Sequence, residues 1–329
     1  KLASALEGVE RVEKAIQTSQ GKRKEHEIRV TDLEGKVSKY RDQLMSVKTN
    51  EEYKAMTKEI EFARDDIVIH LAARTLKGLP RRSLRSDFFD QANTFGTKNL
   101  VESMMCSGAT RLIFMSTDMV YGIPESNPIA EHHPRNPIGE YGLSKLAAEE
   151  YIINCQLSGD VQSTIFRPRL ILGPGRLGFF DKIFQLVERN LPIPIIGDGC
   201  NRFPYLSVSD LVNAVVKVIK QDCWNEVFNV SSEKSPPVHD VLSALIKHSN
   251  SRSWIIKLPS DLTKYLLESL DTISLSPLYP EQFHIADKDF VLDISNVKKA
   301  LNWNPEINDL EMLISSYDQF KRDRYSDLH

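Results

Sequence analysis

The first 64 positions carry apolar residues at alternating steps of three and four along an otherwise polar chain. One run comprises Leu2, Leu6, Val9, Val12 and Ile16, and a later one Leu33, Val37, Tyr40, Leu44 and Val47. This spacing predicts helices with one narrow apolar stripe, the pattern of a coiled coil.

A helix restart is predicted in the middle of this segment. Thr49 and Glu52 have the spacing of a capping box, and a second stripe follows at Tyr53, Met56, Ile60 and Ala63. Two stripes separated by a cap favour an antiparallel helical hairpin over residues 1–64. A single long, slightly broken helix is the alternative, which periodicity alone leaves open.

The pattern changes at Asp65, where strands and helices begin to alternate. Residues 65–73 form a continuous apolar run that ends in small residues, which predicts a strand buried on both faces. Helices are predicted at 88–107 and 141–157, and strands at 111–116 and 163–167. This alternation indicates an α/β fold with a doubly wound parallel sheet.

Composition narrows the class of protein. The chain has 329 residues, 41% of them hydrophobic, and a formal net charge of −3. We expect no nucleic-acid partner from this charge and no membrane span from the apolar runs. The chain begins with Lys1 and no signal-peptide core, so we expect a cytoplasmic protein that is a fragment or a processed product. The four cysteines, which form no Cys-x-x-Cys pair, are expected to be reduced thiols: Cys106, Cys155, Cys200 and Cys223.

Tyr141 and Lys145 are the strongest candidates for chemistry. Residues i and i+4 of a helix lie one turn apart on the same face, so the Lys145 ammonium is expected near the Tyr141 phenol. A nearby cation lowers the pKa of a phenol from its usual value of about 10. A tyrosine so placed can remove a proton from a substrate hydroxyl.

A second candidate lies upstream, where the strand predicted at 111–116 runs into Ser116-Thr-Asp-Met-Val-Tyr-Gly122. Doubly wound sheets bind ligands at the carboxyl ends of their strands, so Thr117 is expected to hydrogen-bond to the same reacting oxygen. The alternative is a strand-end hydroxyl that satisfies local backbone groups.

Together these segments resemble the extended short-chain dehydrogenase/reductase family, the NAD-dependent epimerases and dehydratases, over about residues 65–320. The resembling segments occur in family order: His70-Leu-Ala-Ala73, the helix at 93–100, Ser116–Gly122, Tyr141 with Lys145, Phe166–Gly175, Gly197–Asp210 and Asp293–Pro305. The resemblance implies a truncated Rossmann-like sheet with a small C-terminal substrate domain, preceded by the coiled-coil hairpin. The implied domains are 1–64, 65–167 and 168–329, with 205–232 returning to the sheet.

The resemblance also implies roles for individual residues. Thr117, Tyr141 and Lys145 would form the catalytic site, and Arg202 would bind the phosphates of a nucleotide sugar. The cofactor, NAD or NADP, would contact Leu71, Ala72, Ala73, Asn93, Tyr141, Lys145 and Pro168. A surface arginine in a loop is the alternative for Arg202.

Two features depart from the family pattern. Dehydratases of this family follow the catalytic Thr with Asp-Glu, whereas this chain has Asp118-Met119, which favours oxidoreduction or epimerisation over dehydration. Asp118 is expected to act as a substrate contact or an acid, and a solvated or capping carboxylate at the strand end is the alternative. No Gly-x-x-Gly-x-x-Gly turn precedes Asp65, so we expect the pyrophosphate site to be missing and cofactor binding to be weak or absent.

Residues 40–61 resemble the coiled coil of the C4-type zinc-ribbon proteins. The Cys-x-x-Cys pairs of that family are absent, so no metal site is expected. We interpret the chain as a fusion or substitution with a junction near 62–66.

The predicted function is therefore an NAD(P)-dependent oxidoreductase or epimerase acting on a nucleotide sugar. The alternatives are oxidation of another small alcohol, as by a 3β-hydroxysteroid dehydrogenase, and a non-catalytic chimera that cannot bind NAD. Family members commonly dimerise through the helices corresponding to 88–107 and 141–157, which predicts a homodimer.

Overall fold

A computed structural model describes residues 67–76, 79–173 and 176–326. By their contacts, residues 1–67 and 102–110 form one unit, and residues 68–101 and 111–329 form a second. The coiled coil predicted at 1–64 and the proposed junction lie outside the described residues. Within the first unit, the described residues are Ile67 and 102–110. The latter include the end of the helix at Phe95–Ser107.

The second unit contains a four-stranded sheet in the order β1-β2-β3-β7. Strand β2 (Arg111–Met115) pairs in parallel with β3 (Gln162–Pro168), which pairs in parallel with β7 (Glu226–Val230). Leu112, Ile113 and Phe114 of β2 are fully buried, as expected for a strand covered on both faces. The strands predicted at 111–116 and 163–167 are confirmed to within one residue at each end.

The strand predicted at 65–73 is shorter and more exposed than expected. Strand β1 comprises Ile67–His70, and Leu71 lies beyond it with 64% of its surface exposed. Ile69 is also 42% exposed, whereas the neighbouring His70 is buried. The prediction of burial on both faces is therefore wrong, because described residues cover only the face that carries His70.

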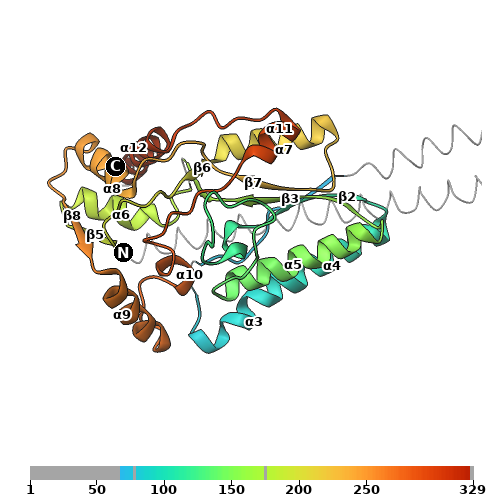
Figure 1. Cartoon of the computed structure of the whole chain (residues 1–329), viewed down its shortest axis with the longest axis horizontal. Coiled ribbons are helices and arrows are strands. Elements are labelled where there is room, and N and C mark those ends of the chain that lie inside the picture. Colours follow the sequence, from blue (N-terminus) through green and yellow to red (C-terminus); the bar gives the residue numbers. More distant parts are fainter. Residues whose placement is uncertain (1–66, 77–78, 174–175, 327–329) are drawn as a thin grey trace, which may run out of the picture. The chain divides into compact units, whose positions relative to one another are not determined.

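Helices flank both faces of this sheet (Figure 1). Helices α3 (Arg85–Phe89) and α5 (Glu140–Leu157) lie on one side, and α7 (Val208–Gln221) and α11 (Ser295–Leu301) on the other. The helix predicted at 141–157 is confirmed. The helix predicted at 88–107 begins earlier, at α3, and passes through a π-helical turn, η2 (Asp90–Thr94), into α4 (Phe95–Ser107). Two 3₁₀ turns complete this part, η1 (Arg82–Leu84) and η3 (Asp118–Tyr121).

The C-terminal part has its own small sheets and apolar core. Strand β4 (Leu170–Leu172) pairs with β6 (Tyr205–Ser207), and β5 (Ile193–Ile196) pairs with β8 (Ile255–Leu258). Helices α6 (Phe180–Glu188), α8 (Val238–His248) and α12 (Asp309–Ser326) surround a cluster of buried apolar side chains that includes Phe184, Leu245 and Tyr317. Of the segment 205–232, β7 lies in the four-stranded sheet, whereas β6 pairs with β4.

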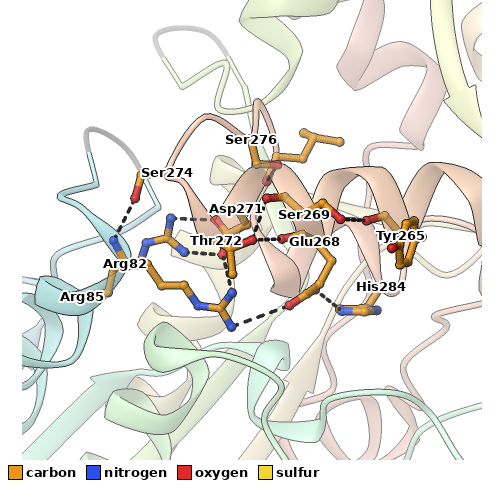
Figure 2. A network of polar contacts seen from close by, with 11 residues as sticks. Arg82, Arg85, Tyr265, Glu268, Ser269, Asp271, Thr272, Ser274, Ser276 and His284 are labelled. Carbon is orange, nitrogen blue, oxygen red and sulfur yellow. Dashed lines mark hydrogen bonds and ion pairs between the residues drawn. The ribbon is translucent and has the colours of Figure 1, made fainter.

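A polar network joins helix α9 (Ser260–Thr272) to the start of α3 (Figure 2). Arg85 donates to both carboxylate oxygens of the buried Asp271, over 2.9 and 2.7 Å. Arg82 lies 3.7 Å from Asp271 and 3.6 Å from Glu268, and Glu268 lies 3.2 Å from His284. His284 directly follows the short helix α10 (Pro280–Phe283), so the network holds α9 and α10 against α3.

No helix among residues 67–326, where described, is long and apolar enough to cross a membrane. All four cysteines are free thiols.

Candidate active site

Thr117 lies just beyond the carboxyl end of β2, where the chain turns into η3. Its backbone is extended, with φ −159°, and its side chain caps η3 by accepting a hydrogen bond from the Met119 N–H over 3.3 Å. Its hydroxyl donates to Oδ1 of Asp118 over 3.1 Å. The buried Thr117 hydroxyl is therefore oriented by two neighbours on its own turn.

Tyr141 lies in the first turn of α5, and a residue far along the chain caps this turn. The Tyr141 N–H donates to Oε1 of Glu281, on α10, over 3.1 Å. Glycine at 139 makes the approach possible, because a Cβ there would lie 2.2 Å from Cδ and Oε1 of Glu281. The carboxylate also faces the positive end of the helix dipole.

The pKa of Tyr141 is raised to about 12, mainly by burial and then by the charge of Asp118. A hydrogen bond with the Thr117 side chain and the charge of Arg176 oppose this shift. The expectation that a neighbouring cation lowers the Tyr141 pKa is wrong for this structure. Desolvation of the phenolate outweighs the charge of Arg176.

Lys145 follows Tyr141 by one helical turn, and its ammonium lies 4.1 Å from the centre of the Phe114 ring on β2. Burial lowers its pKa to about 8, and Glu149 opposes this shift. Glu149 is itself paired with Arg167 of β3 at 2.7 Å. No described residue accepts a hydrogen bond from Lys145 Nζ, so this buried amine has donors for a further polar group.

His70, at the end of β1, lies beside Lys145. Its Nε2 is 3.0 Å from the Thr97 hydroxyl, and its ring lies 5.6 Å from Phe114. Burial and the charge of Lys145 lower its pKa to about 4, so the imidazole is neutral at pH 7. His70 begins the His70–Ala73 motif, for which the family resemblance implied no separate role of the histidine.

The predicted cofactor contacts outside the Tyr141–Lys145 pair differ in exposure. Leu71, Ala72 and Ala73 are exposed beyond β1, whereas Pro168 is buried at the end of β3. Asn93, in the π-helical turn, is buried and its side chain is already paired. It accepts from the N–H of Arg74 over 2.8 Å and donates to the Arg74 carbonyl and the Ser144 hydroxyl, each over 3.0 Å. Asn93 thus fixes the segment after β1 against α5.

Arg169, which sequence reasoning missed, forms a buried ion pair with Asp118. The Arg169 guanidinium carbon lies 3.7 Å from the centre of the Phe203 ring and 4.1 Å from that of Phe290. Its Nε and Nη2 are buried without a hydrogen-bond partner among the described residues. A basic residue two positions beyond the strand predicted at 163–167 was the only sequence signal for Arg169, and it is a weak one.

Arg202, the predicted phosphate ligand, is exposed. Its backbone N–H donates to Asp289 over 2.6 Å, and its carbonyl accepts from the N–H of Phe290 over 3.0 Å. Its guanidinium has no hydrogen bond or ion pair to a described residue. The structure thus fixes the Arg202 backbone and leaves its side chain in solvent.

With this geometry in view, comparison with known proteins identifies the family. The family model described as "NAD dependent epimerase/dehydratase family" matches residues 14–231. The chain belongs to this family. The match begins within the segment predicted as a coiled coil, which stays a prediction.

Relatives of this family member include nucleotide-sugar enzymes. The UDP-glucose 4-epimerase of Vibrio cholerae is 26% identical over 253 residues, which cover 75% of this chain and 74% of that protein. The dTDP-D-glucose 4,6-dehydratase of Mus musculus is 30% identical over 253 residues, which cover 74% and 68%. Protein y4nG of Sinorhizobium fredii, described as uncharacterized, is 29% identical over 240 residues, covering 73% of this chain but only 60% of that protein.

Solved structures of the family share the fold. A Bacillus cereus UDP-glucuronic acid 4-epimerase in complex with NAD gives a TM-score of 0.63 at 22% identity, covering 78% of this chain and 74% of that one. A Thermotoga maritima UDP-glucose 4-epimerase with UDP-glucose gives 0.65 at 22% identity, covering 82% of each chain. The Rossmann-like α/β fold predicted from the sequence is thereby confirmed.

The described residues fit the nicotinamide end of an NAD-type cofactor. Lys145 offers a buried amine with unused donors, and Leu71–Ala73 present an exposed strand end of small and apolar residues. The Asn93 side chain cannot donate to a cofactor without releasing Arg74 or Ser144. No described residue forms the glycine-rich turn that holds a pyrophosphate in this family.

Proposed function

We propose that this protein is an NAD(P)-dependent oxidoreductase or epimerase that acts on a nucleotide sugar. The observation that carries the proposal is the packing of η3, capped by Thr117 at the carboxyl end of β2, against the first turn of α5, which carries Tyr141, with Lys145 one turn further along. Their arrangement suits removal of a proton from a substrate hydroxyl. The family relationship supplies the class of substrate.

The proposed mechanism assigns one role to each residue. Tyr141 exchanges a proton with the substrate hydroxyl, and Thr117 hydrogen-bonds to the same oxygen. Lys145 would hold the ribose of the cofactor and would provide a positive charge near the phenol. A bound nicotinamide would supply the hydride chemistry at the adjacent carbon. Because Arg169 engages the Asp118 carboxylate, the proposal favours oxidoreduction or epimerisation over dehydration.

Substrate binding is proposed to involve Arg202, whose exposed guanidinium suits a diphosphate. Replacing Arg202 by Met should raise KM for a UDP-hexose and leave kcat within about twofold, since Arg202 touches no reacting atom in this proposal. The homodimer through 88–107 and 141–157 is also a proposal. A monomeric mass by light scattering at micromolar concentration would contradict it.

Cofactor binding is measured first, because the absence of a glycine-rich turn before Asp65 predicts weak or no binding. Calorimetric titration with NAD⁺ and NADP⁺ measures it directly. Micromolar affinity for NAD⁺ or NADP⁺ would show that the prediction of weak cofactor binding is wrong. Undetectable binding at millimolar cofactor would favour the non-catalytic alternative.

Turnover is then measured at saturating cofactor with UDP-glucose, UDP-glucuronic acid and dTDP-glucose, by nicotinamide absorbance and by product analysis. Tyr141→Phe should abolish turnover and leave the fold intact, because it removes only the hydroxyl. Lys145→Ala should lower both turnover and cofactor affinity, and Thr117→Val should lower turnover by about 10²–10⁴-fold. An active Tyr141→Phe variant would overturn the proposed role of the tyrosine.

A further inference from the structure

Helix α9 presents its apolar side chains to solvent. Of the apolar residues of this helix, only Leu267 is buried, in a small cluster with Ile196 and Phe283. A surface helix normally turns its apolar stripe toward the core. Here large apolar side chains recur at helical spacing along α9 and the turn after it, each with between 37% and 72% of its surface exposed: Leu262, Tyr265, Leu266, Leu270, Ile273 and Leu275. We call these six residues the α9 face.

Three charged side chains of α9 are directed toward the protein instead. Each has a partner outside the helix, the last two of which are drawn in Figure 2: Lys264 with Asp287 at 2.5 Å, Glu268 with His284 at 3.2 Å, and Asp271 with Arg85 at 2.7 Å. The remaining charged residue of the helix, Asp261, lies in its first turn. Polar contacts therefore hold α9 in place, and the α9 face is left apolar and uncharged.

Exposed charged residues next to the α9 face are mostly basic. The Arg82 N–H donates to the Ser274 hydroxyl over 3.1 Å, and Lys182 Nζ donates to the Pro277 carbonyl over 3.2 Å. These contacts place two basic residues at the turn after α9. In residues 81–84 and 257–277 together with Lys182, the exposed charged residues are four basic and one acidic: Arg81, Arg82, Lys182 and Lys257, and Asp261. This rim is positive although the formal net charge of the chain is −3.

An uncharged apolar face with a basic rim matches the surface of a membrane that contains anionic lipid. Apolar side chains enter the boundary between head groups and acyl chains, and lysine and arginine attract the anionic head groups. A second copy of the chain fits less well. A two-fold interface brings the same patch of both copies together, so the basic rims would repel each other.

We propose that the α9 face docks this protein onto a lipid bilayer that contains anionic lipid. Helix α9 would lie in the plane of the interface, with Leu262, Leu266 and Ile273 directed into the lipid. Docking of this kind needs no membrane-spanning helix, and none occurs among the described residues. The proposal goes beyond the proposed function, since it rests on no catalytic residue.

The test is co-sedimentation of the whole chain with sucrose-loaded vesicles, without cofactor or substrate. One set of vesicles contains two parts phosphatidylcholine to one part phosphatidylglycerol, and the other contains phosphatidylcholine alone. The wild-type protein should bind the anionic vesicles more tightly, and added salt should weaken that binding because it screens the basic rim.

The apolar contribution is tested with Leu262→Ser/Leu266→Ser. This variant should bind anionic vesicles at least about tenfold more weakly, because two leucines no longer leave water on docking. The matched control is Val212→Ser/Val216→Ser, which removes two exposed apolar side chains from α7 and should bind as the wild type does. Circular dichroism checks the fold of each variant. Should the leucine variant not fold, Tyr265→Ser, at the most exposed position of the α9 face, replaces it in the same comparison.

The basic rim is tested separately with Arg81→Gln. One basic residue fewer at an anionic surface should weaken binding by about fivefold. Lys220→Gln is the control, because Lys220 is exposed in the last turn of α7, and its loss should leave binding within about twofold of the wild type.

Three outcomes would overturn the proposal. The first is that the wild-type protein does not sediment with anionic vesicles, and the second is that the α9 and α7 variants lose equal affinity. The third is a lower mass by light scattering for Leu262→Ser/Leu266→Ser than for the wild type in the absence of vesicles. That result would show that a second copy of the chain covers the α9 face.

Discussion

The backbone N–H of Tyr141 donates to the side chain of Glu281, 140 residues further along the chain, over 3.1 Å. The carboxylate caps the first turn of the helix that carries both Tyr141 and Lys145. Glu281 lies on α10, and the network of Arg82, Arg85, Glu268 and Asp271 holds this region against α3 (Figure 2). The position of the candidate base therefore depends on the C-terminal part of the chain.

Replacing Glu281 by Ala should loosen the first turn of α5. Loss of a helix cap removes about 0.5–2 kcal/mol of local stability, which corresponds to amide hydrogen exchange about 2- to 30-fold faster. Exchange at residues 140–145, followed by mass spectrometry, measures this. Glu281→Gln is the matched control: its amide oxygen still accepts, so protection should stay at the wild-type level. Equal exchange in Glu281→Ala and wild type would contradict the capping role.

Gly139→Ala should destabilise the protein by about 1–3 kcal/mol, the usual effect of overpacking. The added Cβ would meet Glu281, which is buried and cannot withdraw without losing its bond to Tyr141. The midpoint of urea unfolding reports the change. Gly96→Ala is the control: its Cβ would lie 3.6 Å from the nearest atom, on a helix where alanine is favoured by about 0.5–1 kcal/mol. The defect of Gly139→Ala should shrink in a Glu281→Ala background, and additive effects of the two substitutions would contradict the steric explanation.

Because Lys145 is buried, the stability of the folded protein should increase with pH between about 8 and 10.5. Its pKa is about 8 in the folded protein against an ordinary 10.5, so between these values the unfolded chain binds more protons. The free energy of unfolding therefore receives a Lys145 contribution that rises from about pH 8 to about pH 10.5. Lys145→Met should lack this rise and be more stable than wild type at pH 7, by roughly 1–3 kcal/mol. Parallel stability curves for the two proteins across the window would show that Lys145 is not desolvated.

Arg85 and Asp271 should behave as a buried pair. Asp271→Leu alone leaves the buried Arg85 charge without its carboxylate and should cost about 3–5 kcal/mol, and the double variant should recover most of that loss. Arg85→Met alone should cost less, because the partly exposed Arg82 still lies 3.7 Å from Asp271. Chemical denaturation of the four proteins completes the cycle. Glu233→Gln, which breaks the half-exposed pair with Lys298, should cost less than about 1 kcal/mol. Equal losses at the two pairs would contradict the difference in burial.

The sequence by itself determined the helices and strands whose apolar residues recur with a clear period. It also determined which candidate catalytic residues lie on these helices and strands. The strand at 111–116 and the helix at 141–157 were predicted because apolar runs and helical spacing are local properties of the chain, and the structure has them at 111–115 and 140–157. The same locality placed Tyr141 and Lys145 one helical turn apart and put Thr117 at a strand end.

Only the tertiary structure decided what surrounds those residues. Arg169 reaches Asp118 across 51 positions and Glu281 reaches Tyr141 across 140, and no periodicity within one element specifies such a pairing. The environment also reversed the expected pKa shift of Tyr141, because burial of the phenol depends on how distant segments pack over it. Local spacing thus identified the candidate catalytic side chains, whereas their charge states and hydrogen-bond partners depend on long-range packing.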